Sequence, residues 1–238
     1  AAGGGGAFTT TGSDAYFTGG NIGIGLSSGF GATLHVKGGG TTYDKVALLV
    51  TDSSDVQIMK LTSAGDNIAI GKNALDTVTG GSGLNNVALG LNAGTAISTG
   101  DNNTVIGERA GYALNTGTDN LISGFYAGTA ITNSVGNVYL GYRAGSATAG
   151  SANGRNIAIG YYAMGSGNGD GQENVSLGHY AGSAISSGDY NLLIGRQAGN
   201  AITTGSRNIV LGGYTGGLGV STASFNIIIG DAAGVANA

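Results

Sequence analysis

The side chains that could carry out catalysis are few in this chain, and they are scattered. The chain has no Cys and therefore no thiol nucleophile, and its two histidines, His35 and His179, lie far apart. Acidic residues can pair as the general acid and base of a glycosidase, but here they are sparse and spread along the chain. They include Glu108, Asp119, Asp170, Glu173, Asp189 and Asp231. We therefore expect no catalytic residues and no enzymatic activity.

Two glycine-rich segments have the composition of ligand-binding loops. Residues 168–173 (NGDGQE) are similar to a calcium loop, but the segment occurs once and lacks the tandem copies that complete such a site. Residues 3–6 (GGGG) are not followed by the Lys-Ser/Thr pair that a phosphate loop requires. The sequence predicts a surface loop at 168–173, and no metal or cofactor site.

Composition excludes several classes of partner. The 238 residues include 50 Gly and no Pro or Trp, only 9% are charged, and the net charge is −4. A chain without a basic face is unsuited to nucleic acid or to an anionic membrane surface. No apolar run approaches the roughly 20 residues of a membrane span. So much glycine loses a large conformational entropy on folding, and we expect a repetitive, cooperative structure to offset that loss.

A repeat of 17–19 residues organises the chain from Asn67 onward. Each unit opens with Asn, continues with three mostly apolar residues and closes with Gly, as in residues 191–195 (NLLIG). A period this short, without a helical pattern of apolar residues, is typical of one coil of a β-solenoid. The amides of the opening residues are expected to hydrogen-bond along the stack as a structural ladder. These residues are Asn67, Asn86, Asn103, Asn120, Asn137, Asn156, Asn174, Asn191, Asn208 and Asn226.

The two-residue period of a strand predicts which side chains of each run lie on the same side of it. The second and fourth residues share one side of a strand, and the third residue lies on the other. In the unit that opens at Asn191 these are Leu192 and Ile194 on one side and Leu193 on the other. Because nearly every unit is apolar on both sides, both should be buried. We expect Leu192 and Ile194 to fill the coil and Leu193 to contact a neighbouring chain, which favours a homo-oligomer about a long axis.

A second, shorter strand is expected in the other half of each coil. The segments with this character are Ala96-Ile97, Ala130-Ile131, Ala184-Ile185 and Ala201-Ile202. Glycines that follow them, such as Gly188 and Gly205, should turn the chain back toward the next Asn.

The chain before the repeats divides into two further segments. Residues 1–20 are small, polar and glycine-rich, and are predicted to be a flexible or attachment segment. Residues 21–66 are expected to form a small β-rich module with strands at 21–24, 32–37, 44–52 and 56–62. Residues 67–238 are then a ten-unit solenoid shaft.

The two residues after each closing Gly form a column of large side chains at one corner of the coils. Successive coils would place them about 4.7–4.9 Å apart, close to aromatic contact distance. One interpretation is a stabilising ladder that covers apolar surface. The other is an exposed stripe that binds glycans. The candidate contacts are Tyr126, Tyr142, Arg143, Tyr161, Tyr162, Tyr180, Arg196 and Tyr214.

The tandem runs, such as NVALG at 86–90 and NIAIG at 156–160, resemble the head repeats of trimeric autotransporter adhesins and the related repeats of phage tail fibres. The upstream segment that begins NIGIG at 21–25 is similar to the motif that precedes such repeats in tail fibres. The resemblance covers about residues 20–238 and implies a homotrimeric extracellular fibre that recognises a cell surface. Two departures are a missing Pro in the upstream motif, which has SSGFGA at 27–32, and coils longer than those of the adhesin heads.

Together these features predict an all-β protein, a repetitive β-solenoid within a homotrimeric fibre. The leading hypothesis is a phage tail fibre, extracellular or on the virion, that needs no cofactor. Its partners would be itself, other tail proteins through the N-terminal region, and host surface glycan. The alternative is a secreted bacterial surface adhesin or a self-assembling extracellular filament subunit. Because the last unit stops short of a full coil, we also expect the chain to be part of a longer polypeptide.

Overall fold

The computed structural model describes residues 8–11, 14–17, 46–51, 57–62, 66–78, 82–147, 154–167, 170–215 and 221–233. The chain divides into two units, Ala1–Lys37 and Gly38–Ala238. In the first unit, β1 (Phe8–Thr11) pairs antiparallel with β2 (Asp14–Phe17). The strands expected at 21–24 and 32–37 lie outside the described residues. All the regular secondary-structure elements in the described ranges are β-strands, which confirms the all-β prediction.

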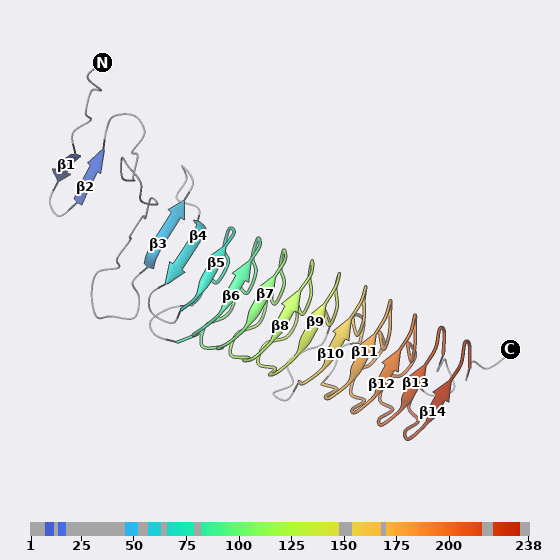
Figure 1. The fold of residues 1–238 in the computed structure, drawn as a ribbon. Helices are drawn as coiled ribbons and strands as arrows, with labels where there is room; N and C mark the ends of the chain where they lie inside the picture. The colour runs from blue at the N-terminus through green and yellow to red at the C-terminus, as the bar shows by residue number, and fades with distance from the viewer. Residues whose placement is uncertain are drawn as a thin grey trace, which may run out of the picture. The chain divides into compact units, whose positions relative to one another are not determined.

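A twelve-stranded sheet runs through the second unit (Figure 1). It starts with β3 (Val46–Thr51) and β4 (Gln57–Thr62), which pair antiparallel at the predicted strands 44–52 and 56–62. β4 pairs antiparallel with β5, so this hairpin belongs to the same sheet as the repeats.

The other ten strands are parallel, and each pairs with its neighbours in chain order. This arrangement confirms the predicted β-solenoid, with one three-residue strand from each repeat. The strands are β5 (Ile68–Ile70), β6 (Val87–Leu89), β7 (Thr104–Ile106), β8 (Leu121–Ser123), β9 (Val138–Leu140), β10 (Ile157–Ile159), β11 (Val175–Leu177), β12 (Leu192–Ile194), β13 (Ile209–Leu211) and β14 (Ile227–Ile229).

The stacked coils keep one register along the sheet. Equivalent residues of successive repeats face each other, as Leu193 faces Val210. Hydrogen bonds between coils continue beyond the strands, for example from the Gly195 N–H to the Leu177 carbonyl and from the Gln197 N–H to the His179 carbonyl. In this single chain, each described coil is completed by residues of the same chain.

The closing glycines make the sharp corner at the end of each strand. From Gly71 to Gly212 they have φ between 123° and 138°, a region that side chains rarely adopt. A Cβ atom on any of these nine residues would lie closer than 3.0 Å to the backbone of the closing glycine in the next coil. Both the dihedral angle and the close approach of the coils therefore require glycine here.

The interior of the coil is lined by the third residue of each run, not by the second and fourth. Leu193 is 0% exposed, whereas Ile194 is 38% exposed. The expectation for these positions was therefore wrong: Leu192 and Ile194 face outward and Leu193 faces the interior. The cause is the Asn at the first position, because its amide is buried on the same side of the strand as the third residue.

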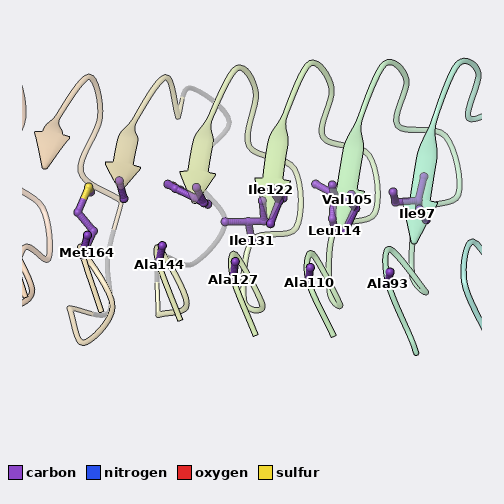
Figure 2. Close-up of a cluster of buried hydrophobic side chains, with 14 of the residues drawn as sticks. Ala93, Ile97, Val105, Ala110, Leu114, Ile122, Ala127, Ile131, Ala144 and Met164 are labelled. Carbon is purple, nitrogen blue, oxygen red and sulfur yellow. The ribbon is translucent and has the colours of Figure 1, made fainter. Parts of the chain in front are cut away.

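Small side chains keep this interior narrow. An alanine follows three residues after most closing glycines, and these alanines, from Ala74 to Ala198, are buried. In Figure 2 the strand residues Val105 and Ile122 lie across from Ala110 and Ala127 on the turns. Ser176 takes the third position of the run that opens at Asn174, and its buried hydroxyl has no hydrogen-bond partner.

Among the described residues, the second strand expected in each coil is not formed. Ile97, Ile131, Ile185 and Ile202 are buried in the interior, but they lie in turns rather than strands. A local hydrogen bond closes each turn, as from the Ile97 N–H to the Gly94 carbonyl at 3.1 Å. The prediction that these isoleucines are buried is confirmed, but the prediction that they lie in strands was wrong. A glycine with φ near 55° lies three residues before each of them and bends the backbone into a turn.

Candidate functional site

The opening asparagines form a buried hydrogen-bonded ladder along the whole stack. Asn67 to Asn208 are at most 4% exposed, and the Asn226 side chain is half-buried. At every step the Oδ1 atom of one Asn accepts the backbone N–H of the next Asn, at 2.6–3.1 Å. The Nδ2 group of most of them donates to a carbonyl on the opposite turn, as Asn191 donates to Gly205 at 2.9 Å. These contacts make the ladder a structural device inside the coil, out of reach of a ligand.

A first column of rings stands at the corner after the closing glycines. Phe125, Tyr142, Tyr161 and His179 come from four successive coils, and their rings stack at centroid distances of 4.9–5.4 Å with interplanar angles of 7–9°. Desolvation raises the pKa of the Tyr161 phenol above its ordinary value.

A second column stands directly beside the first. It contains Arg109, Tyr126, Arg143, Tyr162 and Tyr180. The Arg143 guanidinium carbon lies 5.4 Å from the Tyr126 ring centre and 5.6 Å from that of Tyr162. The Tyr162 and Tyr180 rings stack at 5.1 Å with an angle of 2°.

The same backbone turn in every coil produces these columns. Second-column residues have positive φ, such as 53° at Tyr162, and each donates its N–H to the carbonyl of the residue that follows the closing glycine in the coil before. For Tyr162 that acceptor is Tyr142, at 2.9 Å. Identical turns at the spacing of neighbouring strands place ring upon ring.

Stacking decides what these rings can offer a ligand. A sugar usually packs on the face of an aromatic ring, but the faces of Tyr142 and Tyr161 are covered by rings of the adjacent coils. Their edges and hydroxyl groups remain open, since Tyr142 is 38% and Tyr161 43% exposed. This geometry favours the stabilising ladder of the two interpretations of the column. Arg196 and Tyr214 make a separate contact further along the stack, with the guanidinium carbon 5.0 Å from the ring centre.

The Tyr161→Asn variant is expected to lower the free energy of unfolding by about 1–3 kcal/mol, because Tyr161 loses a ring contact on each side. Tyr190→Asn is the matched control, since its exposed ring contacts Arg207 at a different corner and should cost less than about 1 kcal/mol. Thermal melting of both variants measures the difference. If Tyr161→Asn melts like the unmodified chain, the column is not a stabilising ladder.

A third column precedes each opening Asn, and sequence reasoning missed it. Its members have positive φ, from 43° at Arg155 to 63° at Phe225 among the residues other than Gly136. Asn85, Asn102 and Asp119 are linked by side-chain hydrogen bonds of 3.1–3.2 Å, and Arg155 forms an ion pair with Glu173. The frequent Asn and Asp before the repeat's Asn were the available signal, because these residues tolerate positive φ.

The outward face of the parallel strands is an exposed apolar surface. It consists of the second and fourth residues of each run, and all but Thr104 and Ser123 are Ile, Leu or Val. Ile70 is 42% exposed and Leu121 39%, and Ile227 on the last strand reaches 71%. We call this surface the aliphatic face. Monomeric proteins rarely leave a continuous apolar strip of this length in water.

The described residues contain no group of three or more His, Cys, Asp or Glu side chains that could hold a metal ion. Glu173, the acidic end of the NGDGQE segment, pairs with Arg155. His179 belongs to the first column of rings. The expectation that the sequence has no Gly-x-Ser-x-Gly motif was wrong, because residues 25–29 read GLSSG, and these residues lie outside the described ranges. Among the described residues there is also no helix that could cross a membrane.

Comparison with known proteins gives no match to a family model, to a curated protein or to a solved structure.

Proposed function

We propose that this chain is the shaft of an extracellular adhesive fibre, a phage tail fibre that works as a homotrimer. The observation that carries the proposal is the single continuous stack of ten parallel strands in register (Figure 1). Each strand pairs only with its neighbours in the sequence, so added repeats lengthen the stack without changing its cross-section. That is the design of a spacer or a rod.

Axial contacts on several sides of the coil support a load-bearing role. The Asn ladder runs through the interior, the ring columns run along one corner, and the aliphatic face runs along the strands. The same few interactions are thus repeated at every layer. A protein that presents a receptor-binding end at a distance from a particle or a cell needs this kind of stiffness.

The proposed role is not catalytic and needs no cofactor. It is supported by the use of the chemically capable side chains in structural contacts, such as the ion pair of Glu173 and the ring stacking of His179. Host surface glycan is the proposed external ligand. The groups that would meet it are the open ring edges of Tyr142 and Tyr161 and the exposed Arg196.

Immunoelectron microscopy tests the proposal. Antibodies raised against the chain should label the tails of virus particles produced by the source culture. Label on cells that carry no particles would instead favour the bacterial adhesin or filament. Absence of label on both particles and cells, in a culture where the chain is detected by mass spectrometry, would refute an extracellular fibre of either kind.

A further inference from the structure

We infer that the aliphatic face is the seam along which copies of this chain pack on one another, in parallel and with equal layers aligned. The inference rests on the proposed homotrimeric fibre and adds the surface, the direction and the register of its assembly. The strands that carry this face, β5 to β14, lie side by side along the stack (Figure 1).

The extent of the face argues for a protein partner. Ten strands about 4.8 Å apart make a strip about 45 Å long. With long side chains near 40% exposure, as for Ile68 and Ile159, its accessible apolar area is on the order of 800 Å². That exceeds the 300–600 Å² patch typical of a monomer and equals what one partner buries in a stable interface.

The regular spacing of the face identifies that partner as a second copy. Aliphatic side chains recur at each strand in two straight columns, because the register between successive coils does not shift from β5 to β14. Interdigitation along the whole strip requires a partner with the same strand spacing. Another copy of the same stack provides it, and face-to-face sheets pack in this way in β-sandwiches.

Two polar residues decide the relative direction of the copies. Thr104 and Ser123 occupy the third and fourth layers of the face. In a parallel arrangement with equal layers aligned, each hydroxyl lies in the same layer as its counterparts in the other copies, so that the polar groups gather in one layer. In an antiparallel arrangement with full overlap, Thr104 would meet Leu192 and Ile194 of the other copy, and Ser123 would meet Val175 and Leu177. Because a buried hydroxyl without a partner is costly, the parallel arrangement is favoured.

The width of the face suits three copies around one axis. Packed sheets lie about 10 Å apart, so each wall of a threefold assembly would lie about 5 Å from the axis, and a triangle of that size has sides of about 17 Å. The five residues from the opening Asn to the closing Gly span about 17 Å at the usual rise per residue. The straight part of each coil therefore has the length of one wall.

Single cysteine substitutions test the register directly, because the chain has no native Cys. Thr104→Cys and Ser123→Cys should each give cross-linked chains on oxidation or with a short bismaleimide. Thr116→Cys, at an exposed turn, is the matched control and should stay unlinked. If Thr104→Cys links only when folded together with an Ile194→Cys variant, the copies are antiparallel and the inference is overturned.

Charge on the face tests whether it is the seam at all. The double variant Leu121→Lys with Ile159→Lys should fold, because both side chains are exposed in the single chain, and its mass in sedimentation should fall to that of a monomer. The double variant Thr116→Lys with Thr204→Lys, at exposed turns, should sediment with the same oligomeric mass as the unmodified protein. Circular dichroism verifies that both double variants retain their strands.

The outcomes separate the seam from the fibre. An oligomer that survives both face lysines associates through another surface, which overturns the seam and leaves the fibre standing. If the unmodified protein sediments as a dimer and the Thr104→Cys chains cross-link, the seam stands and the homotrimer is refuted. An unmodified chain that stays monomeric at all concentrations overturns the seam and the homotrimer together, whereas labelling of virus tails is unaffected by any of these results.

Discussion

Replacement of Gly107 by Ala should lower the free energy of unfolding by about 3–5 kcal/mol. Gly107 closes the strand β7 with φ of 124°, where a side chain costs about 1–3 kcal/mol in backbone strain. The new Cβ would also lie 2.6 Å from the Gly124 carbonyl oxygen, so the next coil must move away. Forced displacement in a packed region costs a further 1–3 kcal/mol or so. Chemical denaturation followed by circular dichroism measures the loss.

Gly136→Asn is the matched control for this variant. Gly136 also has positive φ, at 71°, but a Cβ there would meet the Arg155 side chain at 3.4 Å, an ordinary contact. Asn85 and Asn102 occupy the equivalent position in other coils with φ of 57°. We expect the stability to change by less than about 1 kcal/mol, because Asn accepts this conformation and restricts the unfolded chain. If Gly107→Ala also loses less than about 1 kcal/mol, the corner tolerates a side chain and does not set the separation of the coils.

The positions of the strands could be predicted from sequence because two local signals coincide in every repeat. Asn opens the run and Gly closes it, so the length of the strand is bounded at both ends. The strands β3 and β4 could also be predicted, because an apolar run flanked by Ser and Asp turn residues is a local pattern in the sequence. Their pairing with the first repeat strand was not, because no local pattern states which strand a hairpin edge will meet.

The direction of the two strand faces could not be derived from alternation alone. When both faces are apolar, hydrophobicity does not distinguish interior from exterior, and Leu192, Leu193 and Ile194 look equivalent. The deciding term is the first-position amide, because Asn191 finds all its partners inside the coil. Side-chain size was a second available signal. Ala69, Ala88 and Ala158 stand at the third position, and small residues there fit only a narrow interior.

The candidate surface was predicted in part. The rings after the closing glycines do form columns, since identical turns must place equivalent side chains one above another. Contact between rings of successive coils was expected from the coil spacing, but their nearly parallel orientation was not, because it depends on side-chain rotation at each turn. That stacking covers the ring faces of Tyr142 and Tyr161 and changes what the column can bind. The aliphatic face was not predicted as a surface. Its residues were recognised as apolar, but they were assigned to the interior of the coil.

A narrow interior explains why the outer face has to be apolar if the stack is to assemble. Most coils bury one or two alanines and only one or two larger apolar residues, so a single chain removes little apolar surface from water. Fifty glycines increase the entropy lost on folding. Association through Ile, Leu and Val on the outer face would supply burial that the interior cannot.

Replacement of Asn191 by Ala should cost about 3–6 kcal/mol of folding stability. Asn191 donates to the Asn174 Oδ1 atom and the Gly205 carbonyl, and it accepts from the backbone N–H and the Nδ2 group of Asn208. Ala leaves the Asn208 N–H and the Gly205 carbonyl without these partners in a buried site. Each buried group left unpaired costs about 1–3 kcal/mol, and the lost amide leaves a cavity as well.

Asn226→Ala is the control at the end of the ladder. Asn226 is half-buried, and its amide donates to the Asn208 Oδ1 atom at 2.8 Å. Removing it breaks contacts to one preceding coil, where water can replace them, so we expect a loss of about 1 kcal/mol. Denaturation midpoints compare the two variants. Hydrogen exchange at the Asn208 backbone amide adds a local measure, and this amide should exchange faster in Asn191→Ala.

The contrast between these variants tests how the stack holds together. In a one-dimensional array stability is a sum over neighbouring interfaces, and an interior Asn contributes to the interface on each side of it. Asn191 is bonded to Asn174 before it and to Asn208 after it, so its loss weakens two interfaces at once. If Asn191→Ala and Asn226→Ala lose the same stability, the ladder does not couple the coils, and the strand hydrogen bonds alone must do so. If the interior variant loses several times more, the buried amides are what make ten short strands behave as one rod.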